Sequence, residues 1–535
     1  MSDGNAFETI SPLYDDFLRD ESRETGAADS ISFPTGEEDV REIMAVANAR
    51  HLPVTIQGGR TGITAGAVPA GGHVLNLSRM NQVTGLRFDP VEDSFFLSVQ
   101  PGVVLADLRM AIAKREFNTA GWFPGSLDAL TNLRDHHPLF FPPDPTESTA
   151  TIGGMIACNA SGACTFKYGS TRRYIEGLRV VLADGSMVSL RRGQQKAGKR
   201  NFSLLCDNGR KIEGSLPSYR LPPVKNAAGY FAEDDMDLVD LFIGSEGTLG
   251  VAVEAELALV RAPAFEWGVM AFFKSEHDAL TFVRLIRGDI LEMQAPVIRL
   301  RPAAVEFIDS RALNLLRDKK SEYDILADIP DLPPDFHTGV YVEFHGDSED
   351  VLSDAVSTLS EIMVKCGGDE SATWAAMDSH EMKRLHDFRH TVPETVNLVI
   401  DERRKKEPML TKLGTDMAVS NSDLEKVMNL YHSALSATPL QYVMFGHIGN
   451  NHVHVNVLPS SMAEYELGKE IYLSWAREVI CLMGGTVSAE HGIGKLKVAL
   501  LQEMYGEGGI RQMRAVKRAF DPEFRLNRGN LFRDQ

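Results

Sequence analysis

The alternation of apolar and polar residues changes character once along this chain, near residues 260–265. Before that point, short strand-like runs such as residues 52–59 (LPVTIQGG) and 177–190 (GLRVVLADGSMVSL) alternate with helices and glycine-rich turns. After it, strands such as residues 338–346 (TGVYVEFHG) alternate with amphipathic helical segments. Because 535 residues are too many for one ordinary core, this change predicts two α+β domains.

The expected boundaries divide the chain into a helical lead over residues 1–29, a first domain over 30–262 and a second domain over 263–535. Two stretches interrupt the first domain. Residues 122–143 are rich in proline, and residues 191–225 are basic and glycine-rich. We interpret both stretches as insertion loops.

Charge and composition narrow the classes of function. The formal net charge of −19 argues against a nucleic-acid binder, because there is no surplus of cations to neutralise phosphates. The N-terminus lacks the basic and apolar regions of a secretory signal, and no stretch is apolar enough to span a bilayer. The five scattered cysteines suit a reducing compartment. We therefore expect a cytoplasmic protein without a transmembrane segment, with peripheral contact at the inner face of the membrane as an alternative.

A glycine cluster, QGGRTG at residues 57–62, follows a strand candidate. Glycines after a strand let backbone N–H groups approach an anion, because no Cβ stands in the way. The cluster matches neither G-x-x-x-x-G-K-[ST] nor G-x-G-x-x-G, so it is neither of those two phosphate motifs. An isolated cluster of this kind favours the simpler interpretation of a tight turn.

The cluster is not isolated, because related segments follow in order at residues 141–146 (FPPDPT), 151–154 (TIGG), 159–162 (NASG), 167–169 (KYG) and 244–250 (GSEGTLG). In this order and spacing, the set resembles the FAD-binding domain of the vanillyl-alcohol oxidase / p-cresol methylhydroxylase (PCMH) superfamily. The resemblance implies a PCMH-type domain in which FAD lies extended between two α+β subdomains. The first glycine loop would hold the diphosphate.

Some members of that superfamily tether the flavin to a histidine in the first loop. The loop has none here, and His73 precedes a later strand and is interpreted as structural, so we expect non-covalent FAD. The residues that the resemblance assigns to FAD are Gln57, Gly58, Gly59, Arg60, Thr61, Gly62, Pro143, Asp144, Thr151, Gly153, Gly154, Asn159, Ser161, Gly162, Tyr168, Gly169, Glu246, Gly247, Leu249, Gly250 and Asn530.

The densest histidine cluster of the chain is GHIGNNHVHVN at residues 446–456. His452, His454 and Asn456 alternate with valines, so they are expected on one face of a strand. A lone histidine is usually structural. Three histidines within eight residues, beside a turn, leave a structural role and a metal or catalytic role about equally open.

A second motif, SAEHGIG at residues 488–494, places Glu490 beside His491. Adjacent residues point in different directions, so the two side chains can serve different partners. A carboxylate with two histidines would make a nitrogen–oxygen site for a divalent metal such as Zn²⁺ or Mn²⁺. A neutral His491 could accept a proton.

These two motifs resemble those of the FAD-linked D-lactate dehydrogenase / glycolate oxidase FAD subunit / D-2-hydroxyglutarate dehydrogenase family. The family pattern is close to G-H-x-G-D-G-N-x-H-x-N, followed by S-x-E-H-G-x-G. By this resemblance His447, His454 and Glu490 are metal ligands, His491 is the general base and Asn456 contacts the substrate. The resemblance also implies a substrate domain whose C-terminal segment returns to the FAD domain.

Arg389 and Lys412 match the family's arginine and lysine that hold the substrate carboxylate, for which a guanidinium is well suited. Without the resemblance, surface solvation would be the default interpretation of both side chains. The chain departs from the family at residues 450–452, where Asn-Asn-His replaces Asp-Gly-Asn. His452 would then either enlarge the metal shell or contact the substrate. Pro393 stands where several members have a substrate-contacting threonine.

The resemblance implies FAD-dependent oxidation of a small D-2-hydroxy acid, of the lactate, glycolate or 2-hydroxyglutarate type, to the 2-oxo acid. The proton would pass to His491 and the hydride to N5 of the flavin. With no nicotinamide fingerprint or cysteine cluster in the chain, we expect an external acceptor: an electron-transfer flavoprotein, a quinone or an iron–sulfur subunit. The chain is also compatible with a homodimer.

Two other classes remain open at this point. One is a different reaction on the same fold, such as alditol oxidation or redox-neutral alkylglycerone-phosphate synthase chemistry. The other is a non-enzymatic flavin- or metal-binding subunit or sensor. The paired histidine and S-A-E-H-G motifs argue against the first class. The second class would leave without a role the full set Arg389, Lys412, His447, His454, Glu490 and His491.

Overall fold

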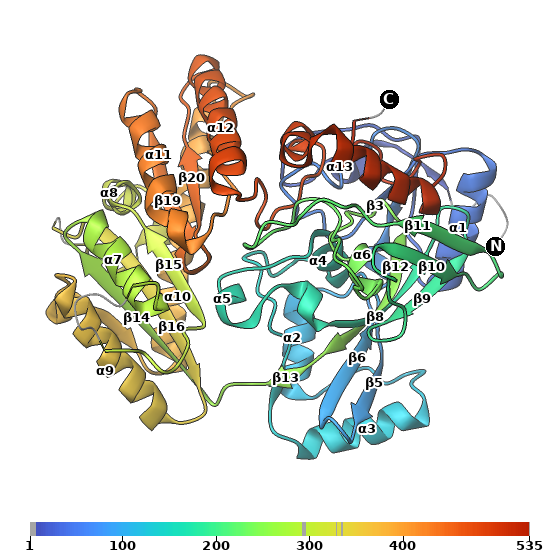
Figure 1. Ribbon diagram of the computed structural model, residues 1–535, viewed down its shortest axis with the longest axis horizontal. Coiled ribbons are helices and arrows are strands. Elements are labelled where there is room, and N and C mark those ends of the chain that lie inside the picture. Colours follow the sequence, from blue (N-terminus) through green and yellow to red (C-terminus); the bar gives the residue numbers. More distant parts are fainter. Residues whose placement is uncertain (1–6, 291–295, 328, 333–334, 534–535) are drawn as a thin grey trace.

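The computed structural model describes residues 7–290, 296–327, 329–332 and 335–533, which form two α+β bodies side by side (Figure 1). The first contains the PCMH-type subdomains, and the second carries a large antiparallel sheet covered by helices. The predicted fold class is confirmed. Among the described residues, no helix combines the length and the apolar character needed to cross a membrane.

A four-stranded sheet with the order β1-β2-β4-β3 begins the first body. Strands β2, β4 and β3 pair in parallel, and the apolar face of α1 covers them. The glycine cluster starts where β3 ends. The elements are β1 (Glu8–Thr9), β2 (Ser30–Ser32), α1 (Glu37–Ala49), β3 (Val54–Gln57) and β4 (His73–Asn76).

The N-terminal lead is less helical than predicted. Only a 3₁₀ helix, Pro12–Leu18, forms there, and β1 pairs with β2 ahead of it. A proline at the start of that helix and the pairing of residues 8–9 leave no room for a longer helix. Residues 1–6 lie outside the described residues.

A five-stranded antiparallel sheet with the order β5-β6-β12-β8-β9 forms the second subdomain. A hairpin with Asp184 and Gly185 at its turn joins β8 to β9. The elements are β5 (Val83–Asp89), β6 (Ser94–Val99), α2 (Leu105–Lys114), α3 (Pro124–Asp135), β7 (Leu139–Phe140), α4 (Ile152–Cys158), α5 (Thr165–Tyr168), β8 (Ile175–Val181), β9 (Met187–Arg191), α6 (Val239–Phe242), β12 (Val251–Ala258) and β13 (Val260–Arg261).

Both stretches interpreted as insertion loops contain regular structure. Residues 122–143 hold α3, which starts at a proline in the favourable first helical position. Residues 191–225 hold a hairpin of β10 (Asn201–Leu205) and β11 (Lys211–Ser215), whose turn carries Asn208 and Gly209. The loop interpretation was wrong because composition was weighed above these local signals.

The second body is built on a seven-stranded antiparallel sheet with the order β17-β14-β16-β15-β19-β20-β18. Its elements are β14 (Phe265–Phe273), α7 (Glu276–Arg287), β15 (Ala304–Ile308), α8 (Ser310–Lys319), β16 (Thr338–Gly346), α9 (Glu349–Lys365), β17 (Trp374–Ala376), α10 (Ser379–Arg404), β18 (Leu413–Gly414), α11 (Leu424–Ser436), β19 (Tyr442–His447), β20 (His452–Val457) and α12 (Met462–Met483).

The chain then crosses back to the first body, where α13 (Val498–Phe520) packs (Figure 1). The amide of Val54 donates to the carbonyl oxygen of Arg525, and the amide of Asn527 donates to that of Val54, at 2.9 Å each. Nζ of Lys517 donates to the carbonyl oxygen of Thr248 at 2.8 Å. This return brings the motif at residues 488–494 between the two bodies.

Candidate active site

A cavity of about 970 Å³ lies between the two bodies. One wall consists of the loop after β3, the start of α4 and the turn before β12. The other consists of α10, the ends of β19 and β20, and the segment that includes Glu490 and His491. The cavity has the size and the mixed polar and apolar lining typical of a site for a cofactor and a small substrate.

The first wall is a cradle of backbone and small side chains. The predicted FAD residues that line it are Gly58, Gly59, Arg60, Thr61, Gly62, Thr151, Gly153, Gly154, Ser161, Glu246, Gly247, Gly250 and Asn530.

Close packing explains two of the glycines in this wall. A Cβ on Gly58 would lie 2.3 Å from Oγ1 of Thr151, and one on Gly153 would lie 2.6 Å from Cβ of Pro101. A Cβ on Gly62, in contrast, would meet no protein atom within 4 Å. The loop is therefore packed tightly from behind and open in front, which fits an extended anionic cofactor approaching the backbone.

The remaining predicted FAD residues do not line this cavity: Gln57, Pro143, Asp144, Asn159, Gly162, Tyr168, Gly169 and Leu249. Several of them support the cradle from behind. Nε2 of Gln57 donates to the carbonyl oxygens of Phe17 and Ala67, at 2.7 Å each. Asp144 accepts from the amide of Cys164 at 2.9 Å. The hydroxyl of Tyr168 lies 2.8 Å from Nδ1 of His345, which draws that side chain toward the second body.

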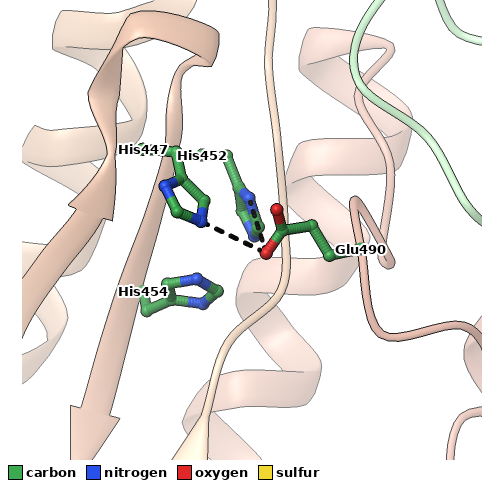
Figure 2. A group of neighbouring side chains, drawn as sticks. All are labelled: His447, His452, His454 and Glu490. Atoms are coloured by element: carbon green, nitrogen blue, oxygen red, sulfur yellow. Dashed lines mark ion pairs between the residues drawn. The ribbon is translucent and has the colours of Figure 1, made fainter. Parts of the chain in front are cut away.

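The second wall carries a cluster of three histidines and a carboxylate. Figure 2 shows His447, His452 and His454 converging on Glu490, which approaches from the opposite side. One potential ligand atom of each residue lies within 4.8 Å of the other three. Nε2 of His447 is 3.3 Å, and Nδ1 of His452 is 3.9 Å, from Oε2 of Glu490.

Each histidine is held through its other ring nitrogen. Nδ1 of His447 lies 2.7 Å from Oε1 of Glu306, and Nδ1 of His454 lies 2.8 Å from the carbonyl oxygen of Thr415. Nε2 of His452 lies 3.0 Å from Oδ1 of Asp416, at ion-pair distance but without the geometry of a hydrogen bond. Outer partners of this kind fix the ring orientation in metal sites.

One nitrogen of each ring is left toward the centre, and both ring nitrogens of His452 are buried without a hydrogen-bond partner among the described residues. Three imidazole nitrogens and one carboxylate oxygen make a donor set suited to a divalent transition metal.

The carboxylates in contact with these histidines are each paired with a lysine or an arginine. The pairs are Glu306 with Arg389 at 3.8 Å, Asp416 with Lys497 at 2.6 Å, and Glu490 with Lys225. Such pairing offsets the cost of burying charge. Burial opposes ionisation of Glu490, but His447 and Lys225 hold its pKa well below the usual range.

Burial lowers the pKa of His447, but Glu306 and Glu490 outweigh burial and raise that pKa to about 9. A metal would therefore displace a proton from His447 at neutral pH.

His491 is placed to act as a base. It lines the cavity, and its ring stacks on that of His454 with the centroids 5.5 Å apart. Nδ1 lies 3.4 Å from Oδ2 of Asp416, which leaves Nε2 available. Burial lowers the pKa of His491 to about 4 despite the opposing effect of Asp416. The imidazole is therefore neutral at pH 7 and able to accept a proton.

The predicted substrate-holding residues also line the cavity. One guanidinium nitrogen of Arg389 and the side-chain amide nitrogen of Asn456 are buried without a hydrogen-bond partner among the described residues. Unused buried donors are costly, so both fit a carboxylate or hydroxyl ligand. Nζ of Lys412 donates to Oδ1 of Asn397 at 2.9 Å. Burial, with a smaller effect from Arg23, lowers the pKa of Lys412 to about 8.

Sequence reasoning missed the charged residues that hold this centre. Asp416 lies in the Gly-Thr-Asp run, two residues after β18 ends at Gly414, and this run was the available signal. Glu306 in β15 and Lys225 after β11 carry no local signal, because they are far in sequence from the histidines.

A second group, Cys164, Glu343 and His345, also has ligand atoms within 4.8 Å of one another. Glu343 already accepts from the hydroxyl of Tyr341 at 2.6 Å and lies 2.7 Å from Nε2 of His345 and 3.0 Å from Nε2 of His386. Glu343 is therefore occupied by partners from the second body, and the network reaches the first body through Tyr168, whose hydroxyl lies 2.8 Å from Nδ1 of His345.

Two family models match the chain. The model described as "FAD linked oxidases, C-terminal domain" matches residues 265–531. The model described as "FAD binding domain" matches residues 28–131 and 126–191. The first match contains the histidine cluster, and the second contains the part of the glycine cradle that lies within residues 57–162.

Similar proteins cover nearly the whole chain. A D-lactate dehydrogenase of Anaerostipes hadrus is 27% identical over 97% of this chain and 93% of its own. Glycolate oxidase subunit GlcD of Bacillus subtilis is 27% identical over 94% and 89%. A D-2-hydroxyglutarate dehydrogenase of Stutzerimonas stutzeri is 27% identical over 95% and 91%.

Among solved structures, 4-ethylphenol oxidase from Gulosibacter chungangensis superposes with a TM-score of 0.61 at 16% identity. The match covers 97% of this chain and 92% of that one. At this level of identity, the similarity shows the shared fold.

Proposed function

This chain belongs to the FAD-linked oxidases, and from that membership we propose that it oxidises a small D-2-hydroxy acid to the 2-oxo acid. The observation that carries the proposal is one cavity with a glycine cradle on one wall and three histidines, Glu490 and His491 on the other. The similarity to D-lactate, glycolate and D-2-hydroxyglutarate enzymes supports the substrate class.

The chain's own residues would bind and orient the acid. Arg389 offers a guanidinium with an unused donor, and Asn456 offers an unused amide. Lys412 adds a positive charge at neutral pH, since its pKa is about 8. Together these groups would fix the substrate carboxylate and hydroxyl relative to the cradle.

His491 would accept the hydroxyl proton at Nε2. Asp416 holds Nδ1 of the same ring, so it would set the tautomer and stabilise the imidazolium that forms. Lys497 and Oγ of Ser488 both bond Oδ2 of Asp416, at 2.6 and 2.7 Å, which keeps that carboxylate ionised and fixed.

Two groups fit the cavity walls. FAD would lie along the cradle without a covalent bond, because His73 is fully buried in β4, does not line the cavity and lies 2.9 Å from Oγ of Ser30 through its Nδ1. The flavin supplies a two-electron acceptor when bound. His447, His452, His454 and Glu490 would hold a divalent metal, Zn²⁺ or Mn²⁺, which supplies Lewis acidity toward the substrate oxygens when bound.

His452 is the point at which this chain departs from its family pattern, and we propose that it is a fourth ligand. The side chain is fully buried and does not line the cavity, which argues against contact with the substrate. Four protein donors complete a tetrahedral zinc site. A metal that also contacts the substrate must therefore accept more than four ligands.

The reduced flavin would pass its electrons to an external acceptor: an electron-transfer flavoprotein, a quinone or an iron–sulfur subunit. All five cysteines are free thiols, which supports a reducing, cytoplasmic compartment. We include in the proposal peripheral contact of the protein with the inner face of the membrane, and assembly of two copies into a homodimer.

An anaerobic titration tests the reaction. The purified flavoprotein is mixed with D- and L-2-hydroxy acids, with and without a chelator, while the flavin absorption is recorded. We expect a D-acid to bleach the flavin and the chelator to abolish the bleaching. If no acid reduces the oxidised flavin, the proposed substrate class is wrong. If the flavin still bleaches after the metal has been removed, the proposed role of the metal is wrong.

A further inference from the structure

Glu490 divides its two carboxylate oxygens between different partners. Oε2 faces His447 and His452 at 3.3 and 3.9 Å. Oε1 accepts from Nζ of Lys225 and, at 3.1 Å, from Oγ of Ser161. Through this one carboxylate, a buried lysine is placed next to the histidine cluster.

Lys225 is deeply enclosed at this point. Its side chain is 4% exposed, and its only other described contact of this kind is the carbonyl oxygen of Gly162, at 3.3 Å. It also helps to line a second cavity, of about 900 Å³. Both groups that Nζ contacts, the Glu490 carboxylate and the carbonyl oxygen of Gly162, are hydrogen-bond acceptors, as an ammonium donor requires.

We propose that Lys225 competes electrostatically with the metal for Glu490, so that the site binds its metal less tightly but leaves it a stronger Lewis acid. The inference rests on the proposed metal at His447, His452, His454 and Glu490. A cation on Oε1 draws electron density from the carboxylate, and it also repels a divalent ion near Oε2. Both effects weaken metal binding while increasing the pull of the metal on substrate oxygens.

A purely structural role for Lys225 makes the opposite prediction for metal affinity. If the lysine only neutralised a buried carboxylate, removing it would disorder Glu490. Metal affinity and activity would then fall together. The competitive role instead predicts that metal affinity rises while the chemical step slows.

The test compares Lys225→Met, Lys225→Gln and Lys225→Arg with the unchanged protein, all loaded with FAD and stripped of metal. Zn²⁺ alone is titrated against a chromogenic chelator to measure affinity. Flavin reduction is then measured at saturating Zn²⁺ with the acid identified in the anaerobic titration. Lys211→Met is the matched control, because Lys211 belongs to the same stretch of chain but is 60% exposed and paired with Glu213 on the surface.

We expect Lys225→Met and Lys225→Gln each to bind Zn²⁺ about tenfold more tightly or better, and to reduce flavin about tenfold more slowly. Lys225→Arg, which keeps a cation beside Glu490, should raise Zn²⁺ affinity far less than the two neutral variants, and Lys211→Met should match the unchanged protein. The glutamine variant can hydrogen-bond Glu490, so it provides the comparison if the methionine variant does not fold. Zn²⁺ affinity that is unchanged or weaker in the folded neutral variant overturns the proposal.

Failure of the metal proposal itself would look different. The unchanged protein would then bind no Zn²⁺ and reduce its flavin regardless of the chelator. If a neutral Lys225 variant gains a Zn²⁺ site in that case, competition by the lysine is supported, and the lysine is the reason that the natural site lacks metal. If no variant gains a site, both proposals are overturned.

Discussion

The cradle and the histidine centre face each other across one cavity but are lined by different kinds of chemical group. The cradle presents backbone and small side chains from loops, and its glycines pack against neighbouring backbone and side chains. The histidine centre presents long polar side chains from β19, β20 and the segment after α12, and a charged or carbonyl partner lies beside each histidine. Substitutions that add side-chain volume to the cradle should therefore impair FAD binding. Substitutions that remove a charge from the histidine centre should impair metal binding or proton transfer.

This difference also separates binding from chemistry. A change in the cradle should remove the flavin and leave the metal in place. A change in the centre should leave the flavin bound and impair metal binding or proton transfer. Five substitutions or titrations test this separation, beginning with the largest expected effect.

Replacing His491 with alanine removes the proposed base. Flavin reduction by the substrate acid should slow by about 10²–10⁴-fold, the usual contribution of a general base. FAD content should not change, since the cradle is untouched. Stopped-flow absorbance measures the rate, and Asp416→Asn should give a smaller loss. A near-normal rate in His491→Ala would disprove the assignment of the base.

Glu306→Gln removes the charge that holds His447. Metal affinity should fall about 10- to 100-fold, as is typical when the outer partner of a histidine ligand is lost. Metal analysis after dialysis against a weak chelator measures the loss. Glu343→Gln is the matched control, because Glu343 is also a buried carboxylate contacted by histidines but belongs to the separate network. Equal losses in both variants would mean that the effect is general destabilisation.

His452→Asn restores the residue of the family pattern at this position. If His452 is a fourth ligand, metal affinity should fall about tenfold while the other three ligands still hold the ion. Turnover at saturating metal should persist. The same chelator competition measures this, and unchanged affinity would exclude His452 from the metal shell.

Gly62→Leu adds a side chain at a position open to the cavity. The FAD dissociation constant should rise at least about tenfold, because forcing extra atoms into a filled site typically costs 1–3 kcal/mol. Metal affinity should be unaffected. Fluorescence titration of the stripped protein with FAD measures this, and Gly125→Leu, at an equally open glycine in α3, is the control. Full FAD affinity in Gly62→Leu would place the cofactor away from this loop.

Lys412 should give a pH dependence with a defined sign. Its pKa is lowered to about 8, so it is charged below that pH and loses its charge above it. Substrate carboxylate binding, and with it kcat/KM, should fall severalfold from about pH 7 to about pH 9. Lys412→Met should lower kcat/KM at pH 7 and abolish this descending limb. A limb that persists in the variant would arise from another group.

Much of the fold could be predicted from local sequence. The change of pattern near residue 260, the hairpin turn at Asp184 and Gly185, and the alternation of His452, His454 and Asn456 with valines each depend on neighbours in the chain. The Asn208–Gly209 turn of the β10–β11 hairpin was equally local, and it was missed because the whole stretch was judged by composition.

The sequence by itself determined two α+β domains, a glycine cradle after β3, and a strand that presents histidines on one face, because backbone sterics and side-chain periodicity act over a few residues. Only the tertiary structure decided that the cradle and the histidines share one cavity. It also decided which charges hold the histidine centre: Glu306, Asp416 and Lys225 approach from separate elements. Their meeting depends on how the return of α13 and the seven-stranded sheet pack together, and no local pattern records that packing.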